Sequence, residues 1–368
     1  MPGITPSRID MHTHAISLDL PDLAASSAFP NWPLVRRTSD TTADIYVGGA
    51  HFRSIDDRCW SLSRRLADMV DTHIDTQVIS PVPITFCYRA PGDEAAVLAR
   101  AQNDFFASLV AGEPERFRAL GAVPLQDVRL AVAELRRCMT ELGFIGVEIG
   151  THVAGTELAD ERLDPFFAAA QDMGALVFVH PDEVLAASRL APLALTFGVG
   201  MPSETAIAGA GMLHSGAFDR WPNLRLCLAH AGGALPMVLP RIDRGWRQAK
   251  ASAPRSGRRS RQAPSTYAAS LYSDSLTYDP LSLYLTVRRF GPDHVFLGTD
   301  YPFAAREEPA GEVLSRADPA LLPPDVVSRI AGDNARAVLG IDGSPELTST
   351  VQLRGRPAHS PAGEGMQR

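Results

Sequence analysis

Short apolar segments alternate along the chain with longer segments in which apolar residues recur every three or four positions. The short segments are rich in Val, Ile, Leu and Ala and are typical of buried strands, whereas the longer ones are typical of helices. We predict strands at residues 9–14, 77–80, 119–123, 146–149, 175–179, 225–229, 271–273 and 295–298. We predict helices at residues 62–74, 93–110, 128–142, 165–173, 203–218, 235–247, 281–290 and 324–339.

Eight strands that each lead into a helix predict an α/β fold, a (β/α)8 TIM barrel. A doubly wound sheet is the competing architecture, but it usually carries a glycine-rich phosphate loop after its first strand, and the sequence has none there. We assign residues 1–342 to the metal-dependent barrel. Residues 17–60 are irregular and rich in Pro, Ser, Asp and Gly, which predicts an insertion subdomain or lid after the first strand. Residues 343–368 predict a disordered tail.

The composition is that of an ordinary globular protein, since 45% of the 368 residues are hydrophobic and 21% are charged. A net charge of −7 argues against nucleic acid or an anionic membrane as the partner, so we expect a small-molecule substrate. No apolar run has the length of a transmembrane helix, and the N-terminal residues lack the features of a signal peptide. We therefore expect a cytoplasmic protein.

Two further features of composition give expectations. The four cysteines form no CxxC pair and are expected to be reduced and mostly buried. In the segment 254–265, four arginines lie among Ser, Gly and Pro. This pattern predicts a solvated loop in preference to a phosphate-binding patch.

Five polar residues follow the predicted strands at the ends where a barrel carries its chemistry. The first strand ends on His12 and His14, whose side chains point to the same face because they are two residues apart. The fifth strand ends on His180, the sixth on His230 and the eighth on Asp300. A lone histidine in a strand is more often a hydrogen-bonded side chain than a ligand, but five such residues at one rim indicate a catalytic site.

These residue types predict one metal ion. Three imidazoles and one carboxylate can bind a zinc-like divalent ion and leave a position for water. The ligand set would be His12, His14, His180 and Asp300. The ion would lower the pKa of the water to roughly 7, and His230, which binds no metal, would be the base that takes the proton. No lysine follows the fourth strand to bridge two metals, so we expect a mononuclear site that holds zinc by default, with Mn2+, Fe2+ or Co2+ as alternatives.

Several motifs resemble those of the amidohydrolase superfamily. They are MHTH at 11–14, VHP at 179–181, GMPSET at 200–205, LAHAGG at 228–233, SDSL at 273–276 and LGTDYPF at 297–303. Within the superfamily the sequence is most similar to the aminocarboxymuconate semialdehyde decarboxylases, and the similarity runs from about residue 9 to residue 341. The resemblance implies a metal-dependent, non-oxidative decarboxylase of 2-amino-3-carboxymuconate 6-semialdehyde or of a related unsaturated or aromatic carboxylate.

The resemblance also implies roles for individual residues. The four rim ligands would bind zinc, and His230 would activate the water. Arg53, in HFR at 51–53, would bind a substrate carboxylate, and Phe303 would contact the substrate. Arg241 would reach into the site of a neighbouring subunit, so the working unit would be a homodimer. Without the resemblance, each arginine would be given a surface or ion-pair role.

The sequence departs from the family beside the metal site. After the His-Pro of the fifth strand the family has Trp-Asp, whereas this chain has Asp182 and Glu183. Leu193, Ala194 and Phe197 occupy a stretch where the family carries a Tyr-Trp pair and a further Trp. We expect these changes to keep the reaction class and to alter the pocket wall, and with it the substrate.

Two alternative functions use the same residues. A hydrolase or hydratase that acts on a lactone, an amide or a carbon–carbon bond would need the same mononuclear metal centre, but would leave the oxygen of water in its product. A metal-binding or regulatory protein without catalysis would bind zinc tightly and be inert toward carboxylates.

Overall fold

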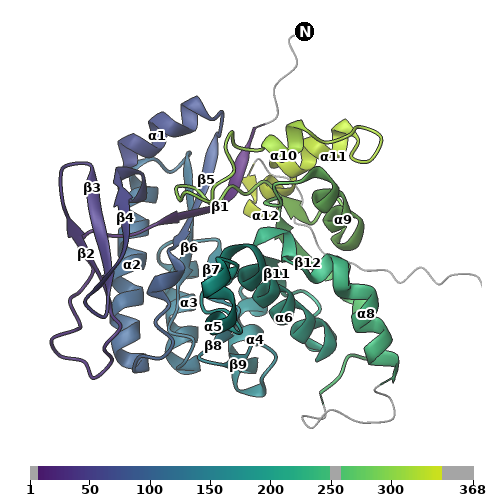
Figure 1. Ribbon diagram of the computed structural model, residues 1–368, viewed down its shortest axis with the longest axis horizontal. Helices are drawn as coiled ribbons and strands as arrows, with labels where there is room; N and C mark the ends of the chain where they lie inside the picture. The colour runs from purple at the N-terminus through teal and green to yellow at the C-terminus, as the bar shows by residue number, and fades with distance from the viewer. Residues whose placement is uncertain (1–6, 249–257, 342–368) are drawn as a thin grey trace, which may run out of the picture.

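Eight parallel strands form one sheet, in which each strand pairs with the next one along the chain. The computed structural model describes residues 7–248 and 258–341. The strands are β1 Ile9–Ala15, β5 Thr76–Pro81, β6 Phe117–Ala122, β7 Gly146–Gly150, β10 Leu176–His180, β11 Arg225–Leu228, β12 Leu271–Asp274 and β13 Val295–Phe296. The last strand returns to the first, because the Met11 amide donates to the Leu297 carbonyl at 2.8 Å. The sheet closes in this way, and the predicted (β/α)8 barrel is confirmed (Figure 1).

Helices follow the barrel strands and cover the outside of the sheet. The longer ones are α1 Leu62–Asp71, α2 Gly92–Gly112, α3 Val128–Thr140, α4 Asp164–Asp172, α6 Met201–His214, α8 Leu235–Gln248 and α9 Pro280–Phe290. The shorter ones are α5 Ala187–Leu190, α7 Ala217–Arg220, α10 Glu312–Ser315, α11 Pro324–Ser328 and α12 Asn334–Leu339. The side chains of Ser61, Asp127 and Asp279 accept hydrogen bonds from first-turn amides and so fix the starts of α1, α3 and α9.

Two segments predicted as helical contain irregular turns. In the segment 203–218, α6 ends at His214, and Gly216, with a φ of 74°, precedes α7. The segment 324–339 contains a π turn, Arg329–Asp333, between α11 and α12. The Ile330 carbonyl of this turn accepts a hydrogen bond from the Leu297 amide at 2.8 Å, which ties the end of the fold to β13. The helical character of both predicted segments is confirmed, whereas apolar periodicity did not reveal the break at Gly216 or the π turn.

A β-bulge in β1 decides where its histidines point. The pairing of β1 with β5 shifts by one residue between Asp10 and Thr13. Strict alternation would place Met11 and His12 on opposite faces of the strand. With the bulge, both face the barrel interior. Met11 belongs to the interior apolar cluster, and the His12 ring lies 5.0 Å from the ring of Phe178 in the same cluster.

Two apolar layers flank the barrel strands, as β10 shows. Val177 and Val179 pack against the helices, whereas Leu176 and Phe178 fill the barrel interior. The same alternation puts His180, the last residue of β10, on the interior side. The barrel is therefore a packed core whose carboxyl end carries polar side chains.

A second, smaller sheet lies within residues 17–60. Its strands β2 Pro33–Arg37, β3 Thr42–Val47 and β4 Ala50–Asp56 pair antiparallel in this order, at the edge of the molecule near α1 and α2 (Figure 1). Ile45 and Ile55 of this sheet share an apolar cluster with Ile16 and Val82, which follow β1 and β5. The insertion after the first strand is confirmed, while its action as a lid stays a prediction.

The basic segment 254–265 is described only from residue 258, and the tail 343–368 lies outside the described residues. Arg258 donates to both carboxylate oxygens of Asp164, at 2.7 and 2.8 Å. The Arg259 guanidinium lies 4.3 Å from the ring centroid of Trp246. The prediction of a solvated loop was wrong for these two arginines, which dock onto α4 and α8.

Two other expectations concern cysteines and membranes. All four cysteines are buried and unpaired, as the sequence predicted. Among the helices of the described residues, none combines the length and the apolar character that crossing a membrane requires.

Candidate active site

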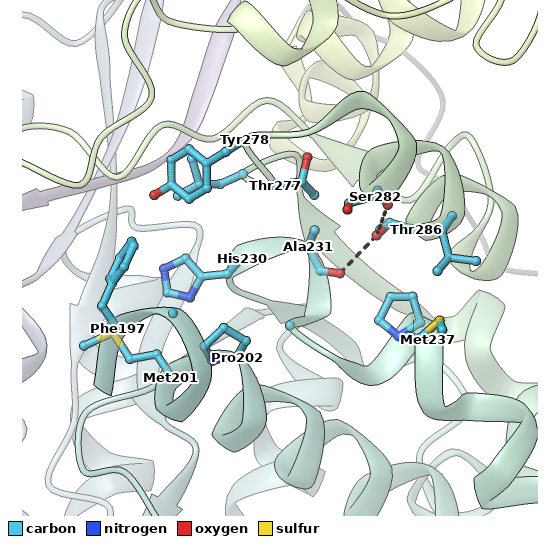
Figure 2. Close-up of a pocket in the computed structure, with 15 residues that line it drawn as sticks. Phe197, Met201, Pro202, His230, Ala231, Met237, Thr277, Tyr278, Ser282 and Thr286 are labelled. Carbon is cyan, nitrogen blue, oxygen red and sulfur yellow. Dashed lines mark hydrogen bonds between the residues drawn. The ribbon is translucent and has the colours of Figure 1, made fainter. Parts of the chain in front are cut away.

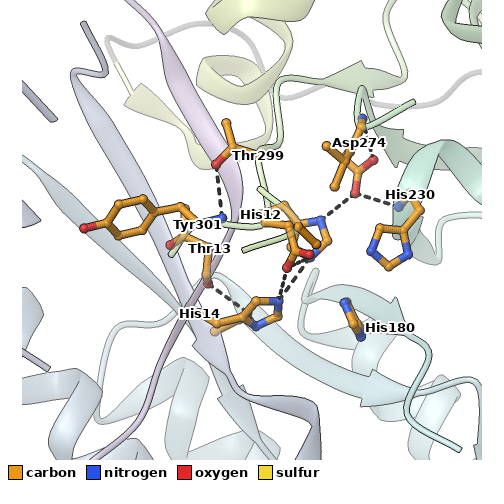
Figure 3. A network of polar contacts seen from close by, with 12 residues as sticks. His12, Thr13, His14, His180, His230, Asp274, Thr299 and Tyr301 are labelled. Atoms are coloured by element: carbon orange, nitrogen blue, oxygen red, sulfur yellow. Dashed lines mark hydrogen bonds and ion pairs between the residues drawn. The ribbon is translucent and has the colours of Figure 1, made fainter. Parts of the chain in front are cut away.

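Four side chains converge at the carboxyl end of the barrel. His12 and His14 come from β1. His180 ends β10, and Asp300 lies in the loop after β13. All four are buried, and one ligand atom from each lies within 4.8 Å of those of the others. The structure thus brings together the predicted metal-ligand set, whose three histidines are seen in Figure 3.

The closest contacts within this set join ring Nε2 atoms and the carboxylate. The Nε2 atoms of His12 and His14 are 3.2 Å apart, and Asp300 Oδ1 lies 3.1 Å from His14 Nε2 and 3.7 Å from His12 Nε2. The Nε2 atom of His180 is buried and has no hydrogen-bond partner in the described part of the chain. Four possible ligand atoms gathered this closely, one of them buried without a hydrogen-bond partner among the described residues, fit a divalent cation that all four would coordinate.

The other ring nitrogen of each histidine meets an acceptor. Nδ1 of His14 lies 2.8 Å from the Pro81 carbonyl oxygen, and Nδ1 of His180 lies 2.8 Å from the carbonyl oxygen of the next residue. Nδ1 of His12 lies 2.7 Å from Oδ2 of Asp274. Because a carbonyl or carboxylate requires a donor, these contacts place the proton on Nδ1 and leave Nε2 free for a metal.

Asp274, at the end of β12, is a site residue that the sequence interpretation missed. Besides the His12 ring, its carboxylate accepts hydrogen bonds from the backbone amides of His230 and Ala231, both at 2.8 Å (Figure 3). Burial is the largest single influence on Asp274 and raises the pKa of its carboxyl group, but the hydrogen bond from His12, electrostatic interactions with His12 and His230 and the bond from the Ala231 amide together hold that pKa below its ordinary value. The available signal was an acid directly after the seventh predicted strand.

The two functional loops have unusual backbone conformations. His230 and Ala231 have φ of 55° and 56°, and Asp300 has φ of 63°. Left-handed conformations of non-glycine residues cost about 1–3 kcal/mol each. The bonds to Asp274 offset this cost at His230, and the bond from the Asp300 amide to the His12 carbonyl, at 2.9 Å, offsets it at Asp300. Contacts between distant strands therefore fix both loops.

His230 faces the metal ligands with a neutral imidazole. Its ring centroid lies 4.9 Å from that of His180 and 5.3 Å from that of His12. Burial, together with the neighbouring charge of His12, lowers the pKa of His230 to about 4. A neutral imidazole beside the ligand set suits the role of base that was predicted for His230.

A small apolar pocket of about 310 Å3 adjoins His230. Phe197, Met201 and Tyr278 gather around the imidazole (Figure 2). These largely apolar side chains make the surroundings of the ring less polar, which favours its uncharged form.

A larger cavity of about 840 Å3, the active-site cavity, opens over the ligand set. Arg53 of β4 and Phe303 both line it, and the Arg53 guanidinium lies 4.7 Å from the Phe303 ring centroid. The Phe303 ring also lies 5.7 Å from the ring of His14. Both predicted substrate contacts therefore lie at this cavity. The insertion supplies one wall and the loop after β13 another.

Arg241 lies elsewhere. It is exposed on α8 and does not belong to the described residues that line the active-site cavity of its own chain. Its contribution to a neighbouring subunit stays a prediction.

Only some departures from the family reach the cavity. Asp182 and Phe197 line it, whereas Leu193 and Ala194 are exposed. Glu183 instead accepts a hydrogen bond from Arg89 Nε at 2.7 Å. Burial raises the pKa of Asp182 to about 7. Of these substitutions, Asp182 therefore changes the polarity of the cavity most directly.

Residues 9–341 match the amidohydrolase family. The 2-amino-3-carboxymuconate-6-semialdehyde decarboxylase of Dictyostelium discoideum is 35% identical over 335 residues, which cover 91% of this chain and 92% of the relative. A similar solved structure is the dihydroxybenzoic acid decarboxylase of Polaromonas sp. JS666, which contains manganese and 2-nitroresorcinol. It superposes with a TM-score of 0.71 at 23% sequence identity, and the match covers 93% of this chain and 99% of the Polaromonas chain. The 5-carboxyvanillate decarboxylase of Sphingomonas paucimobilis has a TM-score of 0.73 at 23% sequence identity, and the match covers 91% of this chain and 99% of the Sphingomonas chain. These two structures share the fold.

Proposed function

Because the chain belongs to the amidohydrolase family, we propose that it is a metal-dependent carboxy-lyase that removes carbon dioxide from 2-amino-3-carboxymuconate 6-semialdehyde or a related unsaturated or aromatic carboxylate. The relative from Dictyostelium discoideum, which is named for that substrate, supports the proposal. The observation that carries it is the buried set of three imidazoles and one carboxylate with a neutral fourth imidazole beside it.

The proposed ligands of the cation are His12, His14, His180 and Asp300. Zinc is our first assignment because the donor set is mainly imidazole, and manganese, present in the Polaromonas structure, is the main alternative. Iron and cobalt also suit these donors. When bound, the cation would act as a Lewis acid that polarises the substrate and lowers the pKa of a water molecule to roughly 7.

In this proposal the protein residues position the substrate and move the proton. Arg53 holds a substrate carboxylate with its guanidinium fork, and the Phe303 ring packs against the conjugated system. His230 takes a proton from water and passes it to the carbon that loses carbon dioxide, so that the electron pair of the broken bond ends in a carbon–hydrogen bond; the hydroxide that is left takes up a proton from the solvent and water is regenerated.

The experiment is carbon dioxide release from freshly prepared aminocarboxymuconate semialdehyde. We expect release with metal-loaded protein and none after chelation. The variant His230→Ala should keep its metal and lose activity by about 100-fold or more. Turnover of this variant at the wild-type rate, with metal content confirmed, would refute the role of His230.

A hydrolase or hydratase on the same centre gives a different isotopic result. With 18O-labelled water, hydrolysis or hydration places the label in the organic product, whereas decarboxylation exchanges only a proton there. A panel of lactones and amides, tested beside the carboxylates, separates the two functions. Tight metal binding without turnover of any of them would instead indicate a protein that has lost catalysis.

We also propose a homodimer in which Arg241 completes the neighbouring site. Arg241 is exposed on α8, as such a contact requires. Mixing the inactive variants His230→Ala and Arg241→Ala should restore activity to about a quarter of the wild-type value, because half of the dimers then carry one intact site. Failure of the mixture to regain activity, with exchange of subunits demonstrated, would place Arg241 outside the site.

A further inference from the structure

The active-site cavity contains an arginine with no role so far. Arg306 lies three residues after Phe303 and lines the active-site cavity together with Arg53 and Arg58. Its side chain is largely enclosed, with 21% of it exposed. Arg306 therefore puts a second positive charge close to the place where Arg53 is proposed to bind a carboxylate.

Phe303 connects the two cations. The Arg53 guanidinium lies over its ring at 4.7 Å, while Nη1 of Arg306 donates to its carbonyl oxygen at 3.3 Å. Arg53 comes from β4 of the insertion and Arg306 from the loop after β13. The two guanidinium groups thus contact the same residue, one at its ring and the other at its carbonyl oxygen, and both belong to one chain.

The charges of the three cavity arginines are balanced differently. Arg58 Nε lies 3.1 Å from Asp68, and its Nη1 lies 3.5 Å from Asp56, so its charge is compensated. Within the described part of the chain, Arg53 forms no ion pair with a carboxylate, and its contacts are with aromatic rings.

The bonds of Arg306 leave room for an anion. Its hydrogen bonds to the carbonyls of Pro302 and Phe303 are long, at 3.4 and 3.3 Å. Its carboxylate partner is Glu308, whose side chain is 65% exposed. Because solvent reaches the Glu308 carboxylate and screens its attraction to Arg306, a ligand carboxylate can displace Glu308.

We infer that Arg306 and Arg53 together bind a second carboxylate of the substrate, distinct from the one that is lost at the metal centre. This inference rests on the proposed function and narrows it, because it makes the substrate a dicarboxylate. Two guanidinium forks on one carboxylate give strong, directional, charge-assisted hydrogen bonds. The position of this subsite would set which of the two carboxylates faces the metal ligands and His230.

The test compares two non-substrate probes that differ by one carboxylate, isophthalate and benzoate. Their affinities for metal-loaded protein are measured by calorimetry. Wild-type protein should prefer isophthalate, and Arg306→Gln should lower isophthalate affinity about tenfold or more while benzoate affinity changes little. Arg306→Lys, which keeps the charge but not the fork, should lie between the two. A merely structural role of Arg306 would change both affinities together.

Two further variants frame the result. Glu308→Gln frees Arg306 and should tighten isophthalate binding by about two- to fivefold. Arg316→Gln, on the exposed pair with Glu312, is the matched control and should change neither affinity. No preference for isophthalate in wild-type protein, or the full preference kept in Arg306→Gln, would overturn the inference. The two proposals can fail separately. If isophthalate binding depends on Arg306 but the protein releases no carbon dioxide from any carboxylate, the proposed function is refuted and the inferred subsite is supported.

Discussion

At the scale of single residues, Asp274 links the proposed metal ligands to the proposed base. One carboxylate oxygen meets both His12 Nδ1 and the His230 amide, and the other meets the Ala231 amide. The Asp274 carboxylate thus sets the tautomer of His12 and stabilises the left-handed turn at His230 and Ala231, which is conformationally unfavourable by itself. Neither task is visible from the residue type alone.

Replacing Asp274 tests this link. Asp274→Asn keeps the shape but turns an acceptor oxygen into a donor group, so either His12 or the turn at His230 loses its partner. We expect metal affinity to fall about 10- to 100-fold, measured by competition with a chelator of known affinity. Asp279→Asn, at the cap of α9, is the matched substitution and should leave metal affinity unchanged. Equal affinities in the two variants would contradict the role of Asp274.

The pKa of His230 predicts the acid limb of the activity. Burial and the neighbouring His12 lower this pKa from 6.5 to about 4, so the base form persists as the pH falls. A bound cation would lower it further, in the same direction. We expect kcat/KM at constant metal content to stay level down to about pH 5.5 and to fall only below it, as His230 takes up a proton. An apparent pKa near that of free imidazole would show that the surroundings of His230 do not lower its pKa.

At the scale of elements, the HAGG turn between β11 and α8 depends on its glycines. Gly233 has a φ of 59°, and a Cβ atom there would lie 2.2 Å from the Pro202 carbonyl oxygen at the start of α6. A side chain at this position would therefore push apart the turn that carries His230 and the helix that lines its pocket. This close approach to Pro202 is the physical reason for glycine at position 233, the last residue of LAHAGG.

Gly233→Ala should lower both stability and activity. The left-handed backbone and the contact with Pro202 lead us to expect a loss of about 2–4 kcal/mol in the free energy of unfolding. Displacement of His230 should lower kcat at least tenfold, measured on the fraction that remains folded. Gly245→Ala, within α8 and with open space at its Cβ, should instead stabilise by about 0.5–1 kcal/mol with kcat unchanged. The same loss in both variants would mean that the approach to Pro202 is unimportant.

At the scale of the whole molecule, the ligand set joins the beginning, the middle and the end of the barrel. Its members come from β1, from β10 and from the loop after β13. A cation held by all of them would bind the closed barrel and not the unfolded chain. Metal binding should therefore stabilise the fold as a whole.

Chelation measures this coupling. A cation at 100 times its Kd contributes about 2.7 kcal/mol. For a chain of this size that corresponds to a Tm shift of roughly 3–5 °C, read by calorimetry with and without chelator. His14→Ala removes a ligand, and its Tm should respond little to chelation. A wild-type Tm that is insensitive to metal would mean that these four side chains do not bind one cation together.

The sequence by itself determined the barrel and singled out the residues that we propose for the site. Apolar periodicity is a local property, and the rule that barrel chemistry follows the strand ends needs only the order of elements. These two facts single out His12, His14, His180, His230 and Asp300 without knowledge of any contact.

Only the tertiary structure decided how these residues are oriented and what supports them. The bulge in β1 depends on pairing with β5, and the tasks of Asp274 depend on contacts between β12 and its neighbours. The position of Arg306 beside Arg53 depends on a loop after β13 meeting an insertion after β1. Each of these features is a contact between residues distant in sequence, which no local pattern of apolar and polar positions encodes.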